Sequence, residues 1–109
     1  LEDRFFLLLD LLGKLFPDRP EPMVNVVVLH ADPGWHVIVF PRGKHRPRAF
    51  LTGDLTLSPA SIDLCGIPVL PIESDFEKAE AADIERVFEE VSLPRDSFDD
   101  VVRTMEAAR

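Results

Sequence analysis

Apolar residues fill most of the first sixteen positions of the chain. Five of them lie at helical spacing and form one apolar stripe: Phe5, Leu8, Leu9, Leu12 and Leu15. Leu7 and Leu11 make the other side of the helix apolar as well. This pattern predicts a helix from about Glu2 to Phe16. A helix that is apolar nearly all round is normally buried on several sides. We therefore expect it to dock on an upstream domain or to form a homodimer with a second copy; the alternative is a core helix of a small α+β domain.

Two segments rich in β-branched residues follow, MVNVVVLH at 23–30 and WHVIVFP at 35–41. They predict a hairpin whose strands are joined by ADPG. Both strands carry apolar residues on both faces, so we expect the hairpin to lie centrally in a sheet. Further strands are predicted for RAFLTG, SIDLCG and IPVLPI, and the prolines of IPVLPI confine that strand to an edge or a bulge.

The last third of the chain has two apolar stripes at helical spacing, separated by Pro94. They consist of Ile84, Val87, Phe88 and Val91, and then Phe98, Val101, Val102 and Met105. The predicted fold is therefore α+β, an antiparallel sheet of four to five strands with helices packed on one face. We divide it into an N-terminal apolar helix with a Pro-rich linker (1–21) and a C-terminal α+β domain (22–109).

Charge narrows the possible partners, because the formal net charge is -8. Residues 73–109 alone contain 12 acidic and 5 basic side chains. Such a surface repels the nucleic acid backbone, so no nucleic acid partner is expected.

The longest apolar run, FFLLLDLLGKLF, is too short to span a bilayer and lacks the features of a signal peptide. We therefore expect no membrane partner. The chain has a single cysteine, which excludes an internal disulfide framework. We expect a cytoplasmic protein.

The side chains that could carry catalysis or bind metal are few. His30, His36 and His45 lack the spacing of a metal site, and no partner cysteine accompanies Cys65. Cys65 lies in an apolar segment interpreted as a strand, where a thiol is buried and inert. The sequence predicts no metal, no cofactor and no catalytic residue in this chain.

One stretch departs from the acidic background. FPRGKHRPR at 40–48 contains three arginines and a lysine. Arginine matches phosphate oxygens with a planar fork, and lysine adds a compact charge. We therefore predict a phosphate- or nucleotide-binding site of Arg42, Lys44, His45 and Arg46, with Asn25 of the first strand as a further candidate. Walker A and G-x-G-x-x-G patterns are absent. The alternative is that the arginines form structural ion pairs with the acidic C-terminal helices.

An ordered set of short motifs resembles a known family. Asn25 stands in an apolar strand, and after it come FP at 40–41, PA at 59–60, DLCG at 63–66, DFEKA at 75–79 and EEVSLPRDSFDDV at 89–101. Together they resemble the C-terminal part of the GDP-hexose phosphorylases. The resemblance is closer still to an uncharacterised bacterial family grouped with them, in which FPRxKHRP and SPASxDxxG recur. Diadenosine tetraphosphate phosphorylase, related to ATP adenylyltransferases, is a more distant relative by the same pattern.

The resemblance implies a histidine-triad-like fold and transfer of a nucleoside monophosphate through a covalent histidine intermediate. It also implies a nucleotide sugar or a dinucleoside polyphosphate as ligand. The H-x-H-x-H or H-x-H-x-Q strand that carries the nucleophile in the family does not occur in these 109 residues. We therefore expect an accessory portion that is inactive alone. The alternative is a non-catalytic interaction or dimerisation module that retains the fold.

Overall fold

The computed structural model describes residues 2–108, and within them it confirms an α+β fold. Leu1 and Arg109, the outer ends of the predicted segments 1–21 and 22–109, lie outside the described residues. The elements in chain order are α1 (Glu2–Leu15), β1 (Val24–Ala31), β2 (Gly34–Pro41), α2 (Arg48–Thr52), α3 (Ser61–Leu64), α4 (Glu73–Lys78), α5 (Ala81–Val91) and α6 (Arg95–Ala107).

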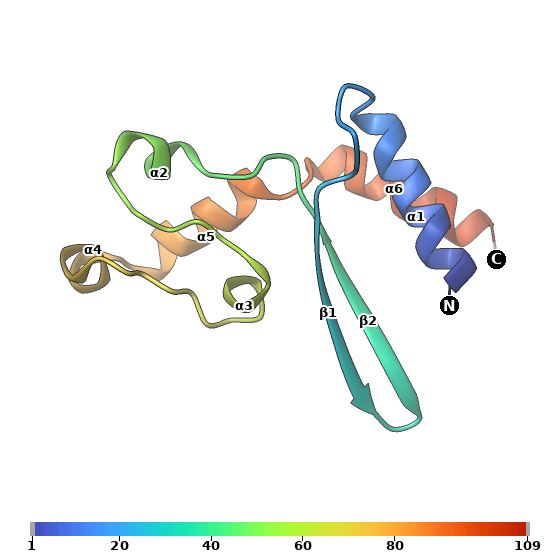
Figure 1. Ribbon diagram of the computed structural model, residues 1–109, viewed down its shortest axis with the longest axis horizontal. Coiled ribbons are helices and arrows are strands. Elements are labelled where there is room, and N and C mark those ends of the chain that lie inside the picture. The colour runs from blue at the N-terminus through green and yellow to red at the C-terminus, as the bar shows by residue number, and fades with distance from the viewer. Residues whose placement is uncertain (1, 109) are drawn as a thin grey trace.

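The sheet consists of a single antiparallel hairpin. Strands β1 and β2 pair from Val24 opposite Pro41 to Ala31 opposite Gly34. The prediction of four to five strands is wrong, because these are the only two strands of a sheet within residues 2–108. The prediction of helices on one face is also wrong, since α1 and α6 lie on one side of the hairpin and α2 to α5 on the other (Figure 1). A two-stranded sheet does not support a histidine-triad-like half-domain.

The segment RAFLTG forms helix α2 instead of a strand. Pro47 precedes the helix with an extended backbone (φ -73°, ψ 161°), and Gly53 follows its last residue. Proline before a helix and glycine after it are ordinary helix boundaries. The apolar side chain of Leu51 points outward and is 74% exposed. Its place in a short apolar run therefore gave a wrong prediction of a strand.

The predicted strands SIDLCG and IPVLPI are respectively a one-turn helix, α3, and an irregular segment. The hydrogen bonds of Asp63 contribute to both outcomes. One carboxylate oxygen accepts a hydrogen bond from the Ala60 N–H at 2.8 Å, and the other accepts one from the Val69 N–H at 2.8 Å. Pro68 and Pro71 have no N–H to give to a sheet. The local bonds of Asp63 therefore replace those of a strand.

The core is divided into two clusters. The first lies between α1, α6 and the base of the hairpin, and its buried members are Leu12, Leu93 and Val101. The second, built around Leu55, Leu57 and Val87, lies between α2, α5 and the loop that follows α2. The helical stripes predicted near the C-terminus thus contribute to different clusters, α5 to the second and α6 to the first.

Helix α1 crosses α6 and packs against it, as Figure 1 shows, and buries Leu12. This side of α1 belongs to the core of the domain. Phe6 and Leu15 on the helix remain exposed, so docking of the outer side on another body stays a prediction. Among residues 2–108, no helix is both long enough and apolar enough to cross a membrane.

Candidate functional site

The basic loop, residues 42–47, connects β2 to α2 and is fastened to the link between α5 and α6. The Gly43 N–H donates to the Val91 carbonyl oxygen at 2.9 Å, and the Leu93 N–H donates to the Pro41 carbonyl oxygen at 3.0 Å. A Cβ on Gly43 would lie 2.9 Å from the Ser92 carbonyl oxygen. Gly43 is therefore suited to this position because the two backbones approach closely.

Arg42 lies inside the protein, with only 4% of its surface exposed. Its Nη1 donates to Asn25 Oδ1 at 2.6 Å and to the Pro59 carbonyl oxygen at 2.9 Å. Its Nη2 donates to the His45 carbonyl oxygen at 2.6 Å. Arg42 thereby joins β1, the basic loop and the segment before α3. Both of its terminal nitrogens, and the side-chain oxygen of Asn25, are used in bracing the loop.

The charge of Arg42 is partly compensated within the interior. Burial lowers the pKa of Arg42, and the negative charge of Asp63 partly offsets this by raising it. Asp63 is itself buried. The Nε of Arg42 is buried without a hydrogen-bond partner among the described residues. The interaction with Asp63 is thus a charge–charge attraction, while the hydrogen bonds of Arg42 go to other groups.

Three predicted site residues lie on the outside of the loop. The side chains of Lys44, His45 and Arg46 belong to exposed residues. The guanidinium of Arg46 lies 4.3 Å from the centre of the Phe50 ring, in a cation–π contact that orients it. The structure therefore separates the predicted set into Arg42 and Asn25, which brace the loop, and three residues that face solvent.

Glu90 on α5 is a residue of the loop environment that the sequence did not identify. Its Oε2 accepts a hydrogen bond from the Arg48 N–H at 2.6 Å and lies 3.2 Å from Lys44 Nζ. The hydrogen bond from Arg48 is the main reason that the pKa of Glu90 is lowered, and Lys44 adds to it. Lys44 therefore forms an ion pair with α5. Within residues 2–108, none of Arg42, Arg46 and Arg48 forms an ion pair with α5 or α6.

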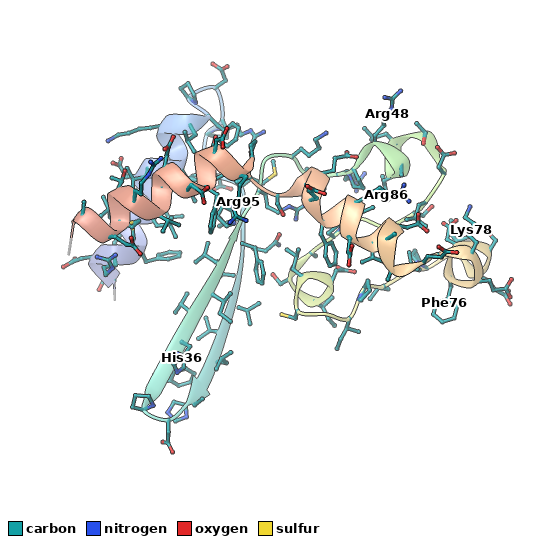
Figure 2. All side chains as sticks on the ribbon, turned by 180° about the vertical axis from the view of Figure 1, so that it is seen from behind. His36, Arg48, Phe76, Lys78, Arg86 and Arg95 are labelled. Atoms are coloured by element: carbon teal, nitrogen blue, oxygen red, sulfur yellow. The ribbon has the colours of Figure 1, made fainter. Side chains whose placement is uncertain are left out.

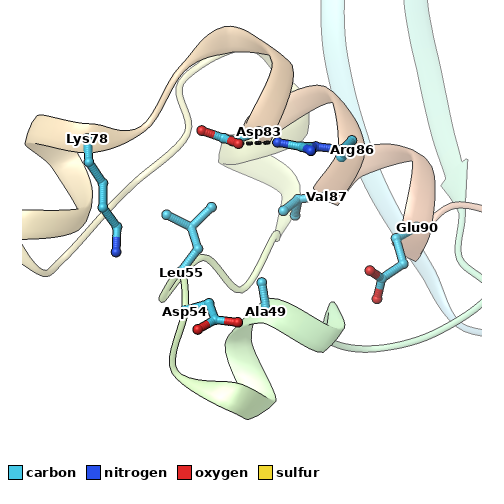
Figure 3. Close-up of a pocket in the computed structure, with 8 residues that line it drawn as sticks. All are labelled: Ala49, Asp54, Leu55, Lys78, Asp83, Arg86, Val87 and Glu90. Carbon is cyan, nitrogen blue, oxygen red and sulfur yellow. Dashed lines mark hydrogen bonds and ion pairs between the residues drawn. The ribbon is translucent and has the colours of Figure 1, made fainter.

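A pocket of about 440 Å³ lies between α2 and α5, next to the basic loop (Figure 3). Its apolar lining is Ala49, Leu55 and Val87, and its charged lining is Asp54, Lys78, Asp83, Arg86 and Glu90. Glu90 is shared between the pocket and the basic loop. The only sequence signal for this pocket is the spacing of its α5 residues, which lie three or four positions apart and therefore on one side of the helix.

The histidines of the hairpin and the cysteine do not form a site. His30 and His36 are exposed, and His36 lies far out on the hairpin (Figure 2). Among residues 2–108 there is no cluster of side chains that could hold a metal ion. The expectation of a buried Cys65 is wrong. Cys65 follows the one-turn helix α3 instead of lying in a strand, and it is exposed.

Comparison with known proteins identifies the family of the chain. No curated protein and no solved structure matches it. A family model described as GDPGP1-like, C-terminal domain, matches residues 23–108, which include the hairpin, the basic loop and helices α2 to α6. The chain therefore belongs to the GDPGP1-like C-terminal domain family.

Proposed function

We propose that this chain is the accessory C-terminal portion of a nucleotidyltransferase- or phosphorylase-like protein that acts on a nucleotide sugar or a dinucleoside polyphosphate. Membership of the GDPGP1-like C-terminal domain family supports the accessory role. The substrate class rests on the resemblance to the GDP-hexose phosphorylases. No residue of this chain is assigned a catalytic role, and the nucleophilic histidine would be supplied from outside it. The chain alone is expected to show no turnover.

The role proposed for the basic loop is to hold a phosphate group of that ligand. The observation that carries it is the brace of Arg42, whose two terminal nitrogens fix the loop from inside. A loop held in one conformation offers its charges to an anion without a large ordering cost, which is what an anion site in an acidic protein requires. Lys44, His45 and Arg46 would contact the anion. Arg42 and Asn25 would act by shaping the loop.

Isothermal titration calorimetry with pyrophosphate tests this role. The informative variant is Lys44→Ala combined with Arg46→Ala, because both side chains are exposed and their removal leaves the brace intact. Charge-assisted hydrogen bonds are worth roughly 1.5–3 kcal/mol each, so the double variant should bind on the order of a hundredfold more weakly.

The matched control is Lys14→Ala combined with Arg95→Ala. It removes the same two charges from exposed positions on α1 and α6, where Lys14 pairs with Asp10 and Arg95 with Asp99. The control should retain most of the affinity. Equal losses in the two double variants would show that only net charge matters, and the proposed site would be rejected. GDP titrated against the same proteins shows whether a nucleoside adds affinity.

A second candidate, a non-catalytic interaction or dimerisation module, is favoured by the outer side of α1. Phe6 on that helix is 58% exposed, although large apolar side chains are usually covered. Wild-type protein that binds neither pyrophosphate nor GDP, yet associates through α1, would support the module. The variant Phe6→Glu, which adds a charge to an exposed position, should then abolish the association.

A further inference from the structure

The outer half of the hairpin is apolar and uncovered. Val28, Leu29, Trp35 and Ile38 are all exposed, and this part projects beyond every helix (Figures 1 and 2). Neither strand contains a lysine, arginine, aspartate or glutamate from 24 to 31 or from 34 to 41. Natural edge strands are usually protected from pairing by charged residues, bulges or prolines. The only such protection here is Pro41, at the base of β2. The edge of this hairpin is therefore available for pairing with another strand.

Near its base, the same hairpin forms one wall of an apolar groove of about 270 Å³. Val37 and Val39 of β2 line it together with Leu8 of α1 and Phe98, Val102 and Met105 of α6. Glu106, an exposed residue, also lines the groove. Phe98 and Val102 also remain partly exposed, so the groove is open to an apolar side chain from outside.

The tip of the hairpin carries a side chain suited to that groove. Trp35 is 67% exposed, and its ring lies next to the His30 ring, with the ring centres 4.9 Å apart. Successive side chains of a strand alternate between its faces. Trp35, Val37 and Val39 therefore lie on the same face of β2, which is the face that borders the groove. The groove and the side chain that could fill it lie on one chain, four residues apart along β2.

We propose that a second copy of this chain covers the hairpin, by antiparallel pairing of the outer part of β2 with the same strand of the second copy. A two-fold axis at Val37 brings Trp35 of each copy beside Val39 of the other, at the mouth of its groove. The indole would enter the groove, and its N–H could donate to the Glu106 carboxylate. Antiparallel edge pairing is self-complementary, so one edge serves both copies. The paired strands contain no lysine, arginine, aspartate or glutamate, so no such charges oppose one another along them.

Trp35 is the only tryptophan of the chain, which gives the test a specific signal. Wild-type protein is studied over a concentration series by sedimentation velocity, and in parallel by tryptophan emission and acrylamide quenching. Formation of a dimer should shift the emission to shorter wavelength and protect the indole from quenching. The two changes should follow the same concentration dependence.

Two variants and one control decide the outcome. Trp35→Ala should weaken the dimer about tenfold or more, because it removes a buried aromatic side chain. Ile38→Lys, a charge on the pairing edge, should abolish it. Phe76→Ala is the matched control, since Phe76 is 70% exposed and lies on α4, far from the hairpin (Figure 2); it should leave the dimer unchanged. Circular dichroism checks that each variant is folded.

A protein that stays monomeric at the highest concentrations, with a freely quenched indole, would overturn the proposal. So would a dimer that Trp35→Ala leaves unchanged, because the contact would then lie on another surface such as α1. Neither result depends on pyrophosphate binding, so this proposal and that of the basic loop fail separately.

Discussion

At the scale of single residues, the main feature of the protein is a buried arginine that organises an exposed basic loop. Four basic residues close together in the sequence predict four equivalent ligands, but Arg42 has a different role from the others. Its fork joins Asn25, the Pro59 carbonyl and the His45 carbonyl. The sequence contained this information only as an isolated polar residue in an apolar strand and a proline far along the chain. Their convergence depends on tertiary structure.

The substitution Arg42→Lys should destabilise the protein although it conserves the charge. A lysine ammonium lacks the planar fork of arginine and cannot bond the same separated acceptors. Each lost hydrogen bond to the charged group costs about 1.5–3 kcal/mol. Urea unfolding should therefore show a clear loss of unfolding free energy. Arg46→Lys, at an exposed position, is the control and should change it little. Similar values for the two variants would mean that Arg42 is not a brace.

At the scale of elements, the long periodic segments were predictable and the short ones were not. The apolar stripes of α5 and α6 and the β-branched runs of the hairpin predicted the right elements, because many residues repeat the same signal. Helices α2 and α3 span five and four residues, which is too short for a helical period to be visible. Their apolar residues looked like strands. The Pro and Gly that flank α2, and the bonds made by Asp63, decide the local structure there instead.

The prediction of four to five strands was wrong for a related physical reason. Apolar residues on both faces of a strand usually mean a central position in a sheet, and the hairpin has this pattern. Within residues 2–108, however, β1 and β2 pair only with each other. The prediction that the hairpin lies centrally in a sheet is therefore wrong, and Val28, Leu29, Trp35 and Ile38 are exposed.

Truncation of Leu57 tests the packing of the second cluster. Leu57 is completely buried in the segment after α2, and it was not part of any predicted element. Leu57→Ala should lower the unfolding free energy by roughly 2–5 kcal/mol, since it leaves a cavity. Leu51→Ala removes the same atoms from an exposed position on the neighbouring helix α2 and should change it by about 0.5 kcal/mol or less. Thermal or urea unfolding measures both. A small effect at Leu57 would contradict the cluster as described.

At the scale of the whole molecule, two small clusters are joined through the segment around Val91 and the basic loop. Carboxylates hold several of the connecting segments by accepting backbone N–H bonds. Asp75 on α4 accepts from Thr56 at 2.9 Å, and Asp83 on α5 accepts from the Glu80 N–H at 2.9 Å. Glu90 in the same way holds the start of α2. Some of the carboxylates of this acidic protein thus serve as hydrogen-bond acceptors for the backbone.

This use of carboxylates predicts acid sensitivity. The pKa of Asp75 is lowered, first by the hydrogen bond from Thr56, and the pKa of Glu90 first by that from Arg48. When the pKa is lower in the folded state, the unfolded state binds more protons, so stability rises with pH. The contribution is complete above the ordinary values of 3.8 and 4.5, and it is lost as the pH falls through the lowered ones. Unfolding midpoints in urea should therefore be level from pH 7 to about 5 and decline below that.

The variant Glu90→Gln separates this effect from general acid repulsion. Glutamine keeps an oxygen that can accept the Arg48 N–H but cannot titrate. Its unfolding midpoint should be lower than that of wild type at pH 7 and converge with it at pH 2.5, because protonation removes the same charge from wild type. Glu89→Gln on the exposed side of α5 is the control, and its midpoints should follow those of wild type throughout. A constant difference between Glu90→Gln and wild type at every pH would show that the charge of Glu90 contributes nothing, and that only its shape holds the loop.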